Sequence, residues 1–102
     1  MEIIQSEAQL NKFVDQGLKA LYFTNLDCGV CGVLKPQVEK LFKEYEIGLM
    51  EVLIHKFREV AAQQLIMQAP TLVVYLDGKE IIRRSGFIDL NRLKMQLERM
   101  LS

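Results

Sequence analysis

The chain has 102 residues, of which half are hydrophobic and a quarter are charged, and its formal net charge is zero. This length and composition predict one globular domain over residues 1–102, with enough apolar residues for a core. The zero net charge argues against nucleic-acid binding driven by bulk charge and against strong electrostatic attraction to a membrane. No apolar run approaches the roughly 20 residues that span a bilayer.

The first ten residues carry Glu2 and Glu7 and lack the basic start and apolar middle of a secretory signal. We therefore expect a cytoplasmic protein. Because thiols are kept reduced in the cytoplasm, a pair of cysteines there is more often catalytic than a structural cross-link.

The N-terminal half predicts a strand, a helix, a second strand and a second helix. A short strand at residues 2–4 is followed by a capping box of Ser6 and Gln9, which starts the first helix. The apolar run Leu18–Thr24 predicts a buried strand. After a short loop, the second helix runs from a pair of cysteines to about Tyr45.

The C-terminal half predicts a strand at Ile47–Ile54, a helix at Phe57–Met67, and a hairpin of the strands Thr71–Leu76 and Lys79–Ser85. A last helix is capped by Asp89. Its predicted core face consists of leucines at helical spacing, which are Leu90, Leu93, Leu97 and Leu101. The resulting order, β-α-β-α-β-α-β-β-α, predicts an α/β fold with a mixed central sheet and helices on both faces.

Cys28 and Cys31 are the only cysteines, and two residues separate them at the junction of a predicted strand and a predicted helix. Two thiols at that spacing can meet across one helical turn and form a disulfide. The start of a helix also stabilises a thiolate, which is the reactive form of cysteine. A Cys-x-x-Cys pair in this setting therefore predicts a redox site.

Two other interpretations of the cysteine pair are weaker. A structural zinc site needs four cysteine or histidine ligands, whereas the chain offers two cysteines and one histidine, His55. We expect no metal site in one chain, although a four-thiolate site shared across a dimer stays open, and we interpret His55 as a surface or loop residue. Cysteines that only fill space in a core fit neither the spacing nor the loop-to-helix junction.

Beyond the cysteine pair, the sequence resembles the thioredoxin family over nearly its whole length. The features in the family's order and spacing are Cys28 with Cys31, Pro36, Ala69-Pro70-Thr71, Asp77-Gly78 and Gly86. The resemblance implies a thioredoxin-like three-layer sandwich with a mixed central sheet. It also implies a cis peptide bond before Pro70 and a substrate groove beside the cysteines.

By this resemblance, the protein is a thiol–disulfide oxidoreductase, and more narrowly a protein-disulfide reductase. Cys28 would be the nucleophile that attacks a substrate disulfide, and Cys31 would resolve the mixed disulfide. The chemistry needs no cofactor beyond the redox-active disulfide itself. The implied partners are protein disulfides and an electron donor of the thioredoxin-reductase type, and we expect a monomer.

The resemblance also implies which residues form the substrate groove. They are Asp27, Gly29, Val30, Ala69, Pro70 and Gly86. The backbone of Ala69 would pair with an extended substrate in the manner of a β-strand. Two rival functions stay open, because a fold does not fix its function. One is a redox-inert module that binds a partner in this groove, and the other is a redox partner specialised for one client or for a small thiol.

Two departures from the family's pattern concern the proton chemistry of Cys31. Tyr22 stands where the family has a buried aspartate, and Glu51 aligns with the lysine that normally pairs with that aspartate. If Glu51 is buried, its carboxyl group could accept the Cys31 proton as a general base near neutral pH. The alternative, which we favour from the sequence alone, is a Glu51 side chain that is partly exposed at a strand end.

Two further departures flank the first cysteine. Val30 replaces the family's proline, and Asp27 replaces its tryptophan. A carboxylate next to Cys28 would oppose formation of the thiolate, which would favour the disulfide and make the pair more reducing. An equally weighted alternative is that Asp27 points into solvent and has little effect.

Overall fold

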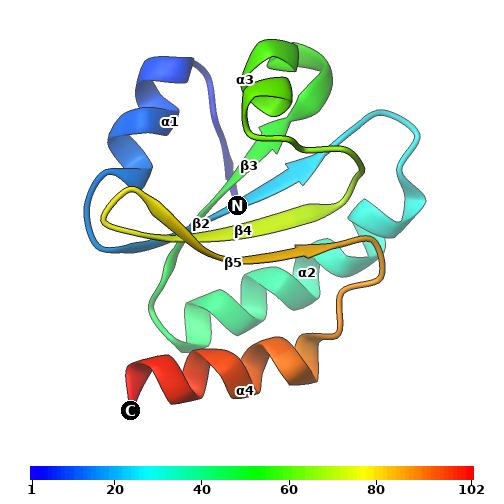
Figure 1. Ribbon diagram of the computed structural model, residues 1–102. Helices are drawn as coiled ribbons and strands as arrows, with labels where there is room; N and C mark the ends of the chain where they lie inside the picture. Colours follow the sequence, from blue (N-terminus) through cyan, green and yellow to red (C-terminus); the bar gives the residue numbers. More distant parts are fainter.

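A five-stranded mixed sheet forms the middle layer of the molecule in a computed structural model that describes residues 1–102 (Figure 1). Its strands are β1 (Glu2–Ile3), β2 (Leu18–Thr24), β3 (Gly48–Leu53), β4 (Thr71–Leu76) and β5 (Lys79–Ser85). The spatial order is β1-β3-β2-β4-β5. The first three of these run parallel to one another, and β4 and β5 continue the sheet in antiparallel pairs.

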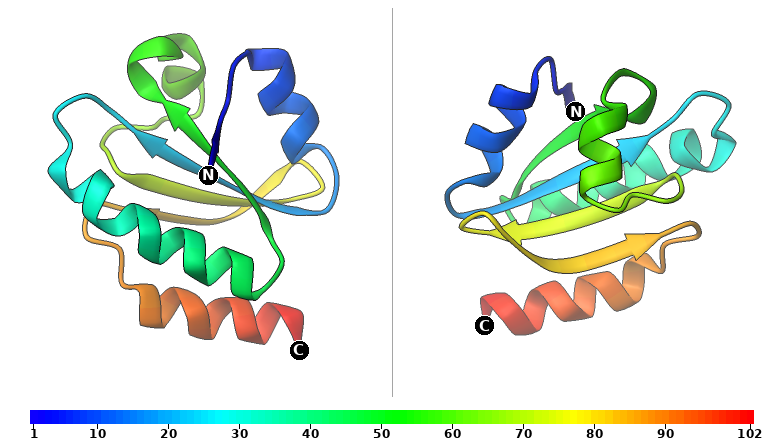
Figure 2. Two further views of the ribbon diagram at one scale, coloured as in Figure 1. Left: turned by 180° about the vertical axis from the view of Figure 1, so that it is seen from behind. Right: turned by 45° about the horizontal axis from the view of Figure 1, so that its top comes forward.

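Helices cover both faces of the sheet, which confirms the predicted α/β fold class. They are α1 (Glu7–Val14), α2 (Gly29–Glu44), α3 (Arg58–Gln63) and α4 (Leu90–Leu101), with a short 3₁₀ turn, η1, at Ile54–Lys56. Figure 2 shows α1 and α3 together on one face and α2 and α4 on the other. None of these helices combines the length and the apolar character that a bilayer crossing requires.

The central strand β2 explains why the core has two halves. Its side chains alternate between the two faces, as the pleat of a strand requires. Leu21 and Phe23 join the core beneath α1 and α3, whereas Ala20 and Tyr22 join the core beneath α2 and α4. All four side chains are fully buried, so β2 is a rigid support for the loop that follows its carboxyl end.

The predicted helix caps are present. The Ser6 hydroxyl accepts a hydrogen bond of 3.1 Å from the backbone N–H of Gln9, and the Asp89 carboxylate accepts one of 3.1 Å from Arg92. One detail of the capping box differs, because the Gln9 side chain accepts from the backbone of Gln5 rather than from that of Ser6. The side-chain oxygens thus satisfy N–H groups that have no partner inside the helix.

Several predicted element limits and one predicted core residue are wrong, and the first strand ends at Ile3 instead of Ile4. The strand predicted to reach Ile54 ends at Leu53, because Ile54 begins the 3₁₀ turn. The helix predicted to reach Met67 ends at Gln63, and Leu65 has the left-handed φ of 57°, which no α-helix accommodates. Leu101 is half-exposed rather than part of the core, because it lies in the last turn of α4, next to the chain end.

Candidate functional site

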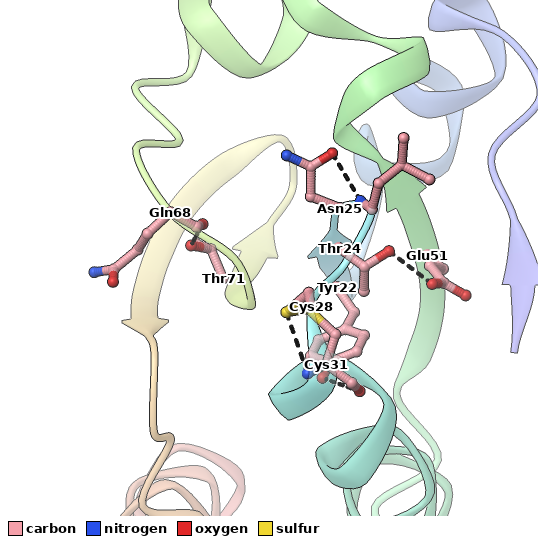
Figure 3. Close-up of a disulfide and its surroundings, with 9 residues drawn as sticks. Tyr22, Thr24, Asn25, Cys28, Cys31, Glu51, Gln68 and Thr71 are labelled. Carbon is pink, nitrogen blue, oxygen red and sulfur yellow. Dashed lines mark hydrogen bonds between the residues drawn. A yellow bond between two sulfur atoms is a disulfide. The ribbon is translucent and has the colours of Figure 1, made fainter.

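Cys28 and Cys31 form a disulfide at the start of α2 (Figure 3). Cys28 is the N-cap of the helix, and its sulfur accepts a hydrogen bond of 3.3 Å from the backbone N–H of Cys31. Cys28 is partly exposed, whereas Cys31 is buried. The two sulfurs therefore differ in access, and only the first can meet a large substrate directly.

The loop between β2 and α2 presents Cys28 at the edge of the sheet. In this loop the Asn25 side chain accepts a hydrogen bond of 3.0 Å from the backbone of Leu26. Asp27 adopts the left-handed φ of 56°, which aspartate tolerates better than most residues. The Asp27 residue is exposed. The free N–H groups and the dipole of the helix start favour negative charge at the Cys28 sulfur.

Strand register brings two further loops to the same edge. Phe23 pairs with Thr71, and Thr71 pairs with Ser85, so the start of β4 and the end of β5 lie beside the end of β2. The Ala69–Pro70 peptide bond is cis, as predicted. The backbone N–H of Gly86 donates a hydrogen bond of 2.9 Å to the Pro70 carbonyl oxygen, which joins the two loops.

The residues predicted for the groove therefore come together at one edge, although they differ in exposure. Asp27 and Gly29 are exposed, Val30, Ala69 and Gly86 are partly exposed, and Pro70 is buried. Neither the N–H nor the carbonyl group of Ala69 takes part in a hydrogen bond within the chain. This backbone unit is free to pair with another chain.

Large apolar side chains near this edge are exposed, which the sequence analysis did not anticipate. They belong to the segments next to the cysteines, Pro70 and Gly86, and are Leu26, Val33, Met67 and Phe87. Phe87 and Met67 are the most exposed, at 88% and 87%. The sequence offered a signal for Leu26 and Phe87, which lie in predicted loops, and none for Val33 and Met67, which lie within predicted helices.

Glu51 is buried in the middle of β3, so the favoured expectation of a partly exposed strand-end residue is wrong. Its side chain is 8% exposed. Register pairs Glu51 with Ile3 on one side and Tyr22 on the other, which places it inside the sheet. The Thr24 hydroxyl donates a hydrogen bond of 2.8 Å to its Oε2.

A lysine that the sequence analysis did not single out completes this buried group. The Nζ of Lys35, from α2, lies 2.9 Å from Oε1 of Glu51 and forms an ion pair with it. The Lys35 side chain is 36% exposed, so the ion pair has one partner in contact with solvent and one partner, the Glu51 carboxylate, that is buried. This contact connects α2 with β3 through two residues that are 16 positions apart in the sequence.

Tyr22 connects the same region to the disulfide. Its buried hydroxyl donates a hydrogen bond of 2.8 Å to the backbone carbonyl oxygen of Cys31. Burial, and to a smaller extent the negative charge of Glu51, raises the pKa of Tyr22 to about 12. The phenol therefore remains a donor over the whole neutral range. In Figure 3, Tyr22 lies directly behind the cysteines, with Thr24 and Glu51 to one side.

These features define a class of protein. A three-layer sandwich, a Cys-x-x-Cys disulfide at a helix start after the central strand, and a cis-proline loop at the same edge are together characteristic of thioredoxin-like proteins.

Comparison with known proteins agrees with this class. The Thioredoxin family model matches residues 2–99. A thioredoxin from Staphylococcus aureus is 26% identical over 98 residues, which cover 94% of each chain. The X-ray structure of Fasciola hepatica thioredoxin is 32% identical, with a TM-score of 0.84 over 97% of this chain and 98% of that one. A Plasmodium falciparum thioredoxin structure is 27% identical, with a TM-score of 0.86 at the same coverage. The chain belongs to the thioredoxin family.

Proposed function

We propose that the protein is a thiol–disulfide oxidoreductase that reduces protein disulfides through Cys28 and Cys31. The observation that carries this proposal is the disulfide at the start of α2, with one accessible and one buried sulfur. Membership of the thioredoxin family supports the same class of reaction.

The proposed reaction begins with the reduced protein. The Cys28 thiolate attacks one sulfur of a substrate disulfide, forms a mixed disulfide with it and expels the other substrate sulfur as a thiolate. Cys31 then loses its proton and attacks the Cys28 sulfur. This second step forms the Cys28–Cys31 disulfide and releases the remaining substrate sulfur as a thiolate, which takes up a proton. The substrate gains two electrons, which the protein loses. Cys31 supplies one of the two protons that the substrate thiolates take up, and water supplies the other.

Glu51 is the proposed acceptor of the Cys31 proton. Its carboxylate is buried on the α2 side of the sheet, and its charge acts on the Tyr22 hydroxyl that contacts Cys31. No other carboxylate of the sheet is buried, which supports Glu51 over the remaining acidic residues as the general base.

The substrate groove is proposed to take an extended segment around the substrate cysteine. The free backbone groups of Ala69 would pair with the substrate as a short β-bridge. Asp27, Gly29 and Val30 would line the side of the disulfide, and Gly86 the opposite side. The exposed apolar side chains around this edge would contact apolar side chains of the substrate.

The proposed cellular setting follows from the same chemistry. The dithiol needs an electron donor after each turnover, and a reductase of the thioredoxin-reductase type is the proposed donor. We propose that the protein is a monomer. We also propose that it acts in the cytoplasm, where reduced thiols keep the Cys28–Cys31 pair available for catalysis.

A trapping experiment tests this function. The Cys31→Ser variant should accumulate a mixed disulfide between Cys28 and oxidised insulin, detectable by mass, because the resolving thiol is missing. The Cys28→Ser variant is the matched control and should form none. A redox-inert binding module would instead bind its partner equally well when both cysteines are serine, and the wild-type protein would fail to reduce any disulfide.

A further inference from the structure

The buried Glu51 carboxylate presents a problem of charge. An ionised carboxylate that is removed from water is costly unless an opposite charge and hydrogen bonds compensate for it. Oε2 is satisfied by the Thr24 hydroxyl at 2.8 Å. Oε1 accepts no hydrogen bond, and its compensating contact is the Lys35 ammonium at 2.9 Å.

Lys35 is placed to act on the resolving cysteine as well as on Glu51. It lies four residues after Cys31 on α2, so the two side chains lie on the same face of the helix, one turn apart. From there its side chain reaches β3 and keeps part of its length in solvent. The same lysine thus adjoins the buried carboxylate and the helical turn that carries Cys31.

We propose that Lys35 is the positioning residue of the proton transfer from Cys31: its ammonium keeps the Glu51 carboxylate ionised and oriented, ready to accept that proton. Lys35 keeps its own proton throughout. The thiol proton of Cys31 passes to the carboxylate, the Cys31 thiolate attacks the Cys28 sulfur, and the proton then leaves for the released substrate thiolate or for water. This inference rests on the proposed oxidoreductase function and adds a residue outside the family features by which the chain was recognised.

The surroundings of Glu51 contain few competing charges. The neighbouring strand β2 contributes the Tyr22 phenol and the Thr24 hydroxyl, and α2 contributes the Lys35 ammonium. Ile4 directly follows the edge strand β1, and its backbone N–H donates a hydrogen bond of 2.8 Å to the carbonyl oxygen of Glu51. Lys35 is the only cation in this set, so its removal leaves the carboxylate without a counter-charge.

The test measures how fast the mixed disulfide is resolved as a function of pH. Reduced protein is mixed with excess oxidised insulin, quenched with acid at set times, alkylated and weighed by mass spectrometry. The rate at which the Cys28–insulin adduct decays is then plotted against pH for the wild type, Lys35→Met, Lys35→Arg and Glu51→Gln. The variant that combines Lys35→Met with Glu51→Gln completes a double-mutant cycle. Urea unfolding confirms that each variant is folded.

The proposal predicts a specific pattern. Without the ammonium, the carboxylate holds a proton up to higher pH, so the acid limb of the Lys35→Met profile should move up by about one pH unit or more. Lys35→Arg should restore the wild-type profile. In the Glu51→Gln background, Lys35→Met should cause no further change.

Three results would overturn the inference. An unchanged Lys35→Met profile would show that the ammonium does not set the protonation of the acceptor. An equal shift in the Glu51→Gln background would show that Lys35 acts on Cys31 without Glu51. A failure of Lys35→Arg to restore the profile would show that the cation is not the active feature. Failure of the proposed function itself is distinguishable, because then the Cys31→Ser variant traps no adduct and the wild type reduces no insulin.

Discussion

The hydroxyl group of Tyr22 donates a hydrogen bond of 2.8 Å to the backbone carbonyl oxygen of Cys31. This contact ties the first turn of α2 to the central strand of the sheet at the residue that carries the resolving sulfur. Tyr22 is fully buried and lies among the core residues beneath α2 and α4. The position of the disulfide therefore depends on a side chain that has no sulfur chemistry of its own.

Removal of this hydroxyl should lower stability modestly. In Tyr22→Phe the ring remains and the buried hydrogen bond is lost, so the free energy of unfolding of the oxidised protein should fall by about 1 kcal/mol in urea titrations. Tyr45→Phe is the matched control, because its hydroxyl bonds to the exposed Glu98 side chain. An equal loss in both variants would show that the contact with Cys31 has no special weight.

The tyrosines predict a loss of stability at alkaline pH. Burial raises the pKa of Tyr22 and of Tyr75 to about 12, and a hydrogen bond to Glu98 raises that of Tyr45 to about 12. In the unfolded chain each phenol has its ordinary pKa of about 10. The resulting stabilisation is complete below pH 10 and is lost as the pH rises through about 12, because the unfolded state then ionises first.

This alkaline prediction is checked by the ultraviolet absorbance of tyrosinate in the folded, oxidised protein, whose cysteines do not titrate. The absorbance should rise about two pH units later than in urea-unfolded protein. A rise near pH 10 in the folded protein would contradict the burial and hydrogen bonding described for these side chains.

Two glycines should respond in opposite directions to alanine. Gly86 has a φ of 71°, and a Cβ there would meet only the Gln68 side chain at an ordinary 3.6 Å, so the cost of Gly86→Ala is conformational and amounts to about 1–2 kcal/mol. Gly32 lies inside α2 with nothing near its Cβ position. Gly32→Ala should therefore stabilise the protein by about 0.5–1 kcal/mol. Urea unfolding of both variants decides this, and a loss in Gly32→Ala would contradict it.

Phe87 should matter for substrates and not for folding. Its side chain is 88% exposed, so Phe87→Ser should change the free energy of unfolding by no more than about 0.5 kcal/mol. Reduction of insulin should slow by about fivefold to tenfold if one apolar contact with the substrate is lost. Reduction of a small disulfide reagent should not change. Leu101→Ser, half-exposed in the last turn of α4, is the control and should alter neither reaction.

The sequence predicted the fold well because its signals are local and consistent. The limits of β2, β4 and β5 are as predicted, since apolar runs end there in turn residues or loops. The end of the helix predicted to reach Met67 was wrong because its last residues include apolar side chains that continue a helical pattern. Leu65 is exposed with a left-handed φ, and Ile66 is buried outside the helix. Tertiary packing, which periodicity does not report, decided that boundary.

The candidate site was predictable only in part. The spacing of Cys28 and Cys31 is visible in the chain, and so is the proline that precedes β4. The environment of Glu51 is not visible, because a glutamate in a strand is most often exposed. Its burial depends on β1 and β2 on either side and on Lys35 from a helix that is distant in sequence. Such a group exists only after the chain has folded.

The most direct test of the central claim is the equilibrium reduction potential of the Cys28–Cys31 pair. The protein is equilibrated in dithiothreitol buffers of graded potential, its free thiols are alkylated, and the two forms are counted by mass. The proposed function predicts one two-electron transition near the thioredoxin value of about −270 mV, whereas a clearly higher potential would indicate an oxidant or an isomerase instead of a reductant. Absence of a disulfide over the whole range, or a pair that stays oxidised well below about −300 mV, would contradict an exchange-active redox site.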